Sequence, residues 1–355
     1  MELLMIKMRR KTVLLSLIGI VIVLLILYLV NFDKVVGEIR KLSPDYFLLL
    51  LGIQLTSILL ASIKWRLILR HSRVLMRNIL PAVFVGYFVN GITPVGLAGG
   101  EPVRAYIISK TDNLPLPTAA SSVIVDLFLE IIPMFLLSGL AIYLIFVKGI
   151  PLILAIFLGF IALVLLLLFI IAITLVINKE FSMKLIRILF NFISNIPLLN
   201  VYIQKHLHEI DEISERFNNA IRLHVMDNYI FFFGTLLSLS VWGLRFLRMY
   251  LIFIALGIPI EFSTVLIVET TVSVLSFMPL FPGALGIWEG ASVTLYTLLG
   301  NISEASSAAA TIINRFFLYL LPLIFGLFAA IYLGLSIQRL INSDKPEIQG
   351  NGNVI

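Results

Sequence analysis

The chain has 355 residues, of which 60% are hydrophobic and 13% are charged, and its mean hydropathy is +1.07. A soluble protein of this length needs more polar residues to cover its surface, so the composition indicates a polytopic helical membrane protein. The net charge of +6 comes from short basic segments beside apolar runs, which favours membrane orientation over nucleic-acid binding. The absence of cysteine and the spacing of the four histidines predict no metal site, and we expect no cofactor.

The N-terminal region predicts a first membrane span with a cytoplasmic N-terminus. Four basic residues between positions 7 and 11 precede an apolar run at 12–30, which at ~1.5 Å per residue is long enough to cross ~30 Å of hydrocarbon. No small-x-small cleavage site follows this run, which disfavours a cleaved signal peptide. A charge-balanced segment at 31–45 is expected to be an external loop, and a second span is expected at 46–63.

Residues 64–77 form the strongest positive-inside signal in the chain. This segment contains five basic residues and no acid, so we expect a cytoplasmic loop. Long apolar runs at 119–147 and 152–177 predict two further spans, and the polar segment 178–227 is expected to be a cytoplasmic amphipathic insert. Because the segment at 110–117 must then also be cytoplasmic, residues 78–109 enter and leave on one side, as a re-entrant helical hairpin.

The second half repeats this order with opposite polarity. Spans are expected at 229–256 and 308–337, with a second hairpin at 264–299 between them. The predicted fold class is therefore all-α, a polytopic membrane protein with about six spanning helices and two re-entrant hairpins in an inverted-topology repeat. Its predicted parts are a transmembrane domain at 1–340, with halves at 46–147 and 229–337 and the insert at 178–227, a disordered tail at 341–355, and a cytoplasmic C-terminus.

The predicted hairpin turns carry matching motifs in the two halves. Pro94 and Glu101 are in register with Pro282 and Glu289, because the spacing between proline and glutamate is the same in both motifs. Irregular backbone at membrane depth is tolerated where protein or a water-filled cavity covers it, so two such breaks indicate a transporter's binding site. The residues expected at the turns are Pro94, Gly96, Gly99, Gly100, Pro282, Gly283 and Gly286.

Charged residues predicted at membrane depth are the candidate substrate-binding residues, because each costs ~2.5–3.5 kcal/mol on insertion scales. They are Glu101, Arg104, Asp126, Glu130, Arg245, Arg248, Glu269, Glu289 and Arg315. Arg245 and Arg248 lie one helical turn apart and suit a phosphate, which arginine binds with two parallel hydrogen bonds. In the alternative interpretation the charges only hold the hairpins in place, Glu101 pairing with Arg104, and Asp126 or Glu130 with Arg245 or Arg315.

Known enzyme motifs are missing from the sequence: it has no P-loop, no G-x-S-x-G and no His-x-x-x-His pair. We therefore predict no catalytic residue and, more generally, no enzyme. A transferase that acts on a lipid-linked donor, with Glu101 or Asp126 as the base, stays open as an alternative.

The hairpin motifs resemble those of the flippase-like transmembrane family of lysylphosphatidylglycerol synthases, the membrane half of the multiple peptide resistance factor. The segment from Pro94 to Tyr106 is similar to that family's Gly-Glu-x-x-Arg-x-Tyr segment, and Pro282 to Glu289 to its Pro-Gly-Gly-x-Gly-x-x-Glu segment. The family's Glu-Arg-x-x-Asp motif reads Asp-Leu-Phe-Leu-Glu at 126–130, so its arginine is missing here. The resemblance covers about residues 10 to 335 and implies a stand-alone member that handles lipid, without a soluble aminoacyl-transfer domain.

The predicted function is translocation of a phospholipid or polyprenyl-phosphate-type lipid across the cell membrane. One alternative is a glycosyl- or aminoacyl-transferase component that acts on a lipid-phosphate donor. A second alternative is a non-catalytic partner that docks a separate synthase through residues 180–224. A second copy of the chain and a separate synthase are the protein partners that stay open.

Overall fold

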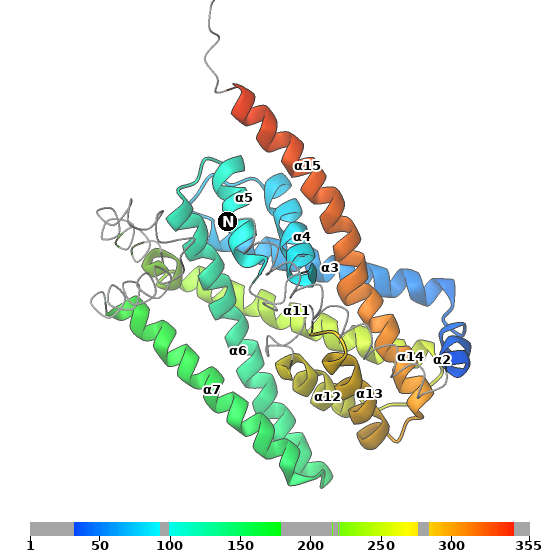
Figure 1. Ribbon diagram of the computed structural model, residues 1–355. Helices are drawn as coiled ribbons and strands as arrows, with labels where there is room; N and C mark the ends of the chain where they lie inside the picture. Colours follow the sequence, from blue (N-terminus) through cyan, green and yellow to red (C-terminus); the bar gives the residue numbers. More distant parts are fainter. Residues whose placement is uncertain are drawn as a thin grey trace, which may run out of the picture.

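The computed structural model describes residues 32–92, 99–178, 215, 219, 221–275 and 284–343, in which every regular element is a helix (Figure 1). The prediction of an all-α polytopic membrane protein is confirmed, because five helical segments in these ranges are long and apolar enough to cross a membrane. They are α3 (Pro44–Ile68), α6 (Leu116–Lys148), α7 (Leu152–Ile177), α11 (Asn228–Ala255), and α14 (Glu304–Arg315) continuing through the π-helix η4 (Phe316–Leu320) into α15 (Leu321–Ser343).

Several predicted features lie outside the described residues. These are the first span at 12–30, the turn residues Pro94, Gly96, Pro282 and Gly283, most of the insert at 178–227, and the tail beyond 343.

Two pairs of shorter helices occupy the positions of the predicted hairpins. The first pair is α4 (Met76–Ile92) and α5 (Glu101–Thr111), and the second is α12 (Phe262–Leu275) and α13 (Ile287–Gly300); the helices of each pair pack against each other. In the first pair the backbones touch, since a Cβ added at Gly100 would overlap the carbonyl group of Gly86. Glycine is therefore required where α5 begins.

The two halves repeat each other in helix order. Asn113 and Asn301, which follow α5 and α13, are equivalent in the register that pairs Pro94 with Pro282, and both adopt left-handed backbone, with φ of 52° and 51°. The helices that come next begin after Pro115 and Ser303, which are equivalent in the same register. Figure 1 shows that α3 and α11 run in opposite directions, as do α6 and the α14–α15 rod. The helix directions therefore agree with an inverted repeat.

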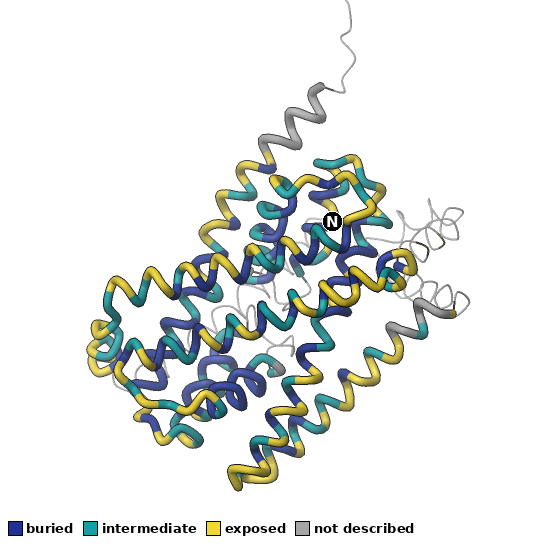
Figure 2. Tube along the Cα trace, turned by 180° about the vertical axis from the view of Figure 1, so that it is seen from behind, coloured by how far each residue is buried: buried dark blue, intermediate teal, exposed yellow. Residues whose placement is uncertain are grey.

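The outer surface is largely apolar, as expected for contact with lipid. Figure 2 shows mainly exposed and intermediate residues along α7, which packs on α6. Large apolar side chains such as Ile153, Phe160 and Phe328 are 72%, 65% and 64% exposed. In a soluble protein such surface would be buried.

One local prediction was wrong. The segment expected as an external loop contains a helix, α2 (Phe32–Ile39), whose Val35 is buried in the apolar core together with residues of α14. Phe32, Val35 and Ile39 recur at helical spacing, and this periodicity outweighs the balanced charges on which the loop prediction was based.

Candidate functional site

A buried ionic cluster connects the first hairpin to α3 and α6. Nζ of Lys64 lies 3.0 Å from Oδ1 of Asp126 and also pairs with Glu130. Nη2 of Arg104 lies 2.6 Å from Oδ2 of Asp126 and pairs with Glu101. Lys64, Arg104 and Asp126 are 1%, 7% and 6% exposed. Asp126 therefore holds two cations from different helices, which fixes α5 against α3 and α6.

This cluster corrects two sequence-based interpretations. Lys64 was expected in a cytoplasmic loop, but α3 continues to Ile68 and Lys64 is buried inside the helical assembly. The alternative interpretation paired Asp126 or Glu130 with Arg245 or Arg315, but Asp126 pairs with Lys64 and Arg104, and Glu130 pairs with Lys64. A local count of basic residues could not show this, because Glu130 is 66 positions away along the chain. The pairing of Glu101 with Arg104, which belongs to the same alternative interpretation, is confirmed.

Helix α11 completes this cluster from the second half. Ser238 accepts a hydrogen bond from Lys64 at 3.0 Å, and the indole Nε1 of Trp242 donates to Oε2 of Glu130 at 2.7 Å. The guanidinium of Arg245 lies over the same indole, 4.8 Å from the ring centroid, within the range of a cation–π contact. Trp242 therefore links the ionic cluster directly to Arg245.

A second polar group lies between α3, α11 and α14. Arg248 is 1% exposed and donates from Nε to the side-chain oxygen of Asn314 at 3.0 Å and from Nη1 to that of Gln54. Asn314 is the repeat equivalent of Asp126, so the two halves place an amide and a carboxylate at matching positions. Two neutral side chains thus satisfy this arginine.

The second hairpin carries its own ion pair. Nε of Arg315 lies 2.5 Å from Oε1 of Glu289, while Oε2 of Glu289 accepts from the backbone N–H of Gly286 at 2.7 Å and caps α13. Glu269 of α12 accepts from the hydroxyl of Tyr296 at 2.9 Å. Among the predicted turn residues that the structure describes, Gly99 and Gly100 precede α5, and Gly286 precedes α13 with φ of 85°.

Arg245 differs from the other arginines at this depth. Among the described residues, Arg104 and Arg315 form ion pairs with carboxylates and Arg248 is held by two amides, whereas Arg245 has no carboxylate within salt-bridge distance. It lines a cavity of about 20 Å³ with Gln54 and with residues of α4, η4 and α15. The cavity therefore lies where helices of both halves meet.

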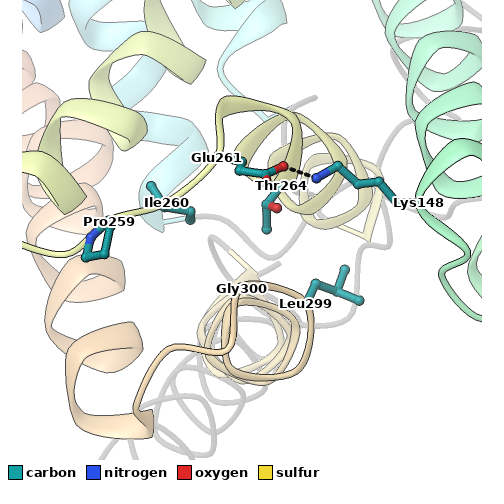
Figure 3. A pocket seen from close by; sticks show the side chains of 7 residues that line it. All are labelled: Lys148, Pro259, Ile260, Glu261, Thr264, Leu299 and Gly300. Atoms are coloured by element: carbon teal, nitrogen blue, oxygen red, sulfur yellow. Dashed lines mark hydrogen bonds and ion pairs between the residues drawn. The ribbon is translucent and has the colours of Figure 1, made fainter.

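A larger cavity lies at a different place. It has a volume of about 420 Å³, and its lining includes Lys148 at the end of α6, Glu261 before α12 and Gly300 at the end of α13 (Figure 3). Lys148 and Glu261 form an ion pair across it. The Glu261 side chain is 72% exposed, so this pair contributes little stability. We regard the smaller cavity at Arg245 as the better candidate, because charge at membrane depth is costly unless it has a function.

Five side chains of the site were missed from the sequence: Gln54, Lys64, Ser238, Trp242 and Asn314. Four of them are uncharged, so a search for charged residues at membrane depth does not find them. The register of the repeat offered one signal, since it places Asn314 opposite Asp126. Gln54 offered another, as a polar residue within a predicted span.

Comparisons with known proteins agree with the membrane architecture. The family model described as "Lysylphosphatidylglycerol synthase TM region" matches residues 16–326. A "UPF0104 membrane protein" of Methanothermobacter thermautotrophicus is 29% identical over 336 residues, which cover 93% of this chain and 95% of that relative. Another UPF0104 membrane protein, from Pyrococcus horikoshii, is 25% identical over 329 residues, covering 89% of this chain and 95% of the relative. No solved structure matches the chain.

Proposed function

Because the chain belongs to the family of the lysylphosphatidylglycerol synthase transmembrane region, we propose that it moves a phosphate-bearing lipid headgroup between the two leaflets of the cell membrane. The observation that carries this proposal is the position of Arg245. This guanidinium lies at the junction of the two halves, borders a cavity, and has no carboxylate within salt-bridge distance among the described residues.

The chemistry of Arg245 suits a phosphate. A guanidinium presents two parallel N–H groups to two phosphate oxygens and remains charged at any physiological pH. A cation at membrane depth is costly when no carboxylate lies within salt-bridge distance of it, and an anionic headgroup reduces that cost. Gln54 also borders the cavity, and its amide adds a hydrogen-bonding group beside the arginine.

The geometry represents a closed arrangement. A cavity of about 20 Å³ holds about one water molecule, so a headgroup enters only when the surrounding helices separate. The π-helix η4 offers a place where they can do so, because the N–H of Leu321 donates to the carbonyl of Phe316 instead of making an α-helical bond, next to Pro322. Rocking of the two inverted halves about Arg245, with the hairpins as gates, would expose the site to each side in turn.

The orientation in the membrane is part of the same proposal. Both termini lie in the cytoplasm, the first hairpin enters from the cytoplasmic side, and the second enters from outside. The lipid is a phospholipid or a polyprenyl-phosphate-type lipid, because both carry the phosphate that the arginine would bind.

A vesicle assay tests the function. The purified chain is placed in phosphatidylcholine vesicles that contain fluorescent phosphatidylglycerol, and the labelled lipid reaching the inner leaflet is measured by its protection from a membrane-impermeant quencher. Arg245→Ala should reduce the rate at least about tenfold, since a buried charge-assisted hydrogen bond contributes about 1.5–3 kcal/mol. Arg245→Lys should keep part of the rate, and Arg40→Ala, which changes an exposed arginine after α2, should leave it unchanged.

The outcomes separate the candidate functions. Equal rates with and without protein would refute translocation. A new lipid product in the same vesicles, formed from an added lipid-phosphate donor, would favour a transferase instead.

A further inference from the structure

The cluster around Asp126 carries one negative charge too many for a buried group. It contains two cations, Lys64 and Arg104, and three carboxylates, those of Glu101, Asp126 and Glu130. With all five ionised, the net charge is two minus three, or −1. Uncompensated charge at this depth costs free energy, so another group must balance it.

Outside the cluster, Arg245 is a cation that is linked to it through one side chain, Trp242. It contacts the ring of Trp242 at 4.8 Å, and the indole N–H of Trp242 donates to Glu130 at 2.7 Å. The positive charge of Arg245 therefore lies one side chain away from the excess negative charge. In the other half, the four remaining candidate residues at membrane depth, Arg248, Glu269, Glu289 and Arg315, sum to zero when all are ionised.

Binding of a phosphodiester upsets this balance. The bound anion neutralises Arg245 and leaves the cluster at −1 with no nearby compensation. One additional positive charge must then enter. A proton fits better than a metal ion, because a metal needs several oxygen ligands and would have to lie beside two cations. Among the described residues, no group of three or more acidic or histidine side chains is arranged to hold a metal.

Glu101 is the carboxylate best placed to take the proton. Asp126 holds both Lys64 and Arg104, and Glu130 receives hydrogen bonds or ion pairs from three donors. Glu101 pairs with Arg104, which it shares with Asp126. The ionised form of Glu101 is therefore the least stabilised of the three carboxylates. Its side chain is 16% exposed and is the more accessible of the two carboxylates that pair with Arg104.

The charged and titratable groups near Glu101 come from each packed element. They are Lys64 on α3, Arg104 on α5 and Asp126 on α6; Tyr87 on α4 lies near Lys64, Arg104 and Glu130. Within this set the cations are already shared with other carboxylates, which leaves Glu101 as the group that can gain a proton without breaking the contacts of Asp126.

We propose that Glu101 is a proton-binding site and that one proton accompanies each lipid phosphate bound at Arg245. The inference rests on the proposed function. The step transfers a proton from water to the Glu101 carboxylate, which loses its charge and loosens its hold on Arg104; the proton leaves when the phosphate leaves. By linkage, lipid binding raises the proton affinity and proton binding raises the lipid affinity by the same factor.

The test measures lipid and protons together. The full chain is placed in phosphatidylcholine vesicles that contain a luminal pH dye, with the membrane voltage clamped, and fluorescent phosphatidylglycerol is added to the outer leaflet. This phosphodiester keeps its charge across the pH range used. Lipid movement into the inner leaflet should acidify the lumen in proportion. At pH values above the apparent pKa of the site, the rate of lipid movement should rise by up to about tenfold for each unit by which the pH is lowered.

Two variants locate the site. Glu101→Gln fixes the cluster at zero charge, so it should move lipid at a pH-independent rate without acidification. Glu289→Gln changes the equivalent glutamate of the second hairpin and should keep both the pH dependence and the proton signal, whatever its rate. If Glu101→Gln does not fold, the proton-to-lipid ratio of the unmodified chain still decides the question.

The results separate the two claims. Lipid movement by the unmodified chain without luminal acidification, or with alkalinisation, would overturn the inference and leave the proposed function standing. Retained proton movement in Glu101→Gln would overturn the choice of Glu101. The absence of lipid movement at every pH would contradict the proposed function, and the inference with it.

Discussion

Replacement of Lys64 by methionine tests the buried cluster most severely. Lys64 is 1% exposed, and it contacts Asp126, Glu130 and Ser238. Methionine fills a similar volume but removes the charge, which changes the net charge of the cluster from −1 to −2. Removing one partner of a buried ion pair costs about 3–5 kcal/mol, because the other partner stays buried without compensation.

This loss should be visible in thermal unfolding of the protein in detergent. For a chain of this size, about 3–5 kcal/mol corresponds to a fall in Tm on the order of 10 °C. Adding Glu130→Gln to Lys64→Met returns the net charge to −1 and should recover part of the loss. Lys41→Met is the matched control, since Lys41 is an exposed lysine paired with Glu38 and should shift Tm little. An unchanged Tm in Lys64→Met, or no recovery in the double variant, would refute the reasoning.

Three further predictions concern packing, pH and topology. Gly100→Ala should destabilise the folded protein by about 1–3 kcal/mol, because the added Cβ would meet the backbone of α4, and this loss should appear as a lower Tm. A Cβ added at Gly139 meets nothing within 4 Å, so the control Gly139→Ala should be neutral or slightly stabilising. Burial, together with the nearby His71, lowers the pKa of His224 from 6.5 to about 4, so the unfolded state binds more protons between these values. Stability should therefore fall by about 3 kcal/mol as pH drops from about 6.5 to about 4, and His224→Leu should remove this part of the loss; an equal loss in both proteins would contradict the assignment. Single cysteines at the exposed, repeat-equivalent positions Leu116 and Glu304 should react with impermeant reagents from opposite sides of the membrane; reaction from the same side would exclude the inverted topology.

The helices could be predicted from the sequence because their signal is local. Apolar runs of spanning length place α6, α7 and α11 within a few residues of their observed bounds. The shorter runs flanking glycine and proline predict the two helix pairs, because a run too short to cross must turn back. The constant register between the two hairpin motifs adds the relation between the halves.

The ion pairs could not be predicted because they join distant parts of the chain. Lys64 follows an apolar span and precedes four arginines, and this context is typical of a loop at the membrane surface. Only the packing of α3 against α6 and α11 shows that it is buried. Likewise, the sequence alone does not distinguish Arg248, which is hydrogen-bonded to two amide side chains, from an arginine without such partners. The sequence therefore indicated which residues could form the site, but not which arginine has no carboxylate within salt-bridge distance among the residues that the structure describes.

The most direct test of the central claim is a cryo-electron microscopy structure of the chain in nanodiscs containing phosphatidylglycerol. We expect the lipid phosphate within hydrogen-bonding distance of Arg245, in a widened cavity between α3, α4, α11 and α15. A phosphate bound only at the Lys148–Glu261 cavity, with Arg245 paired to a carboxylate of the protein, would contradict the account.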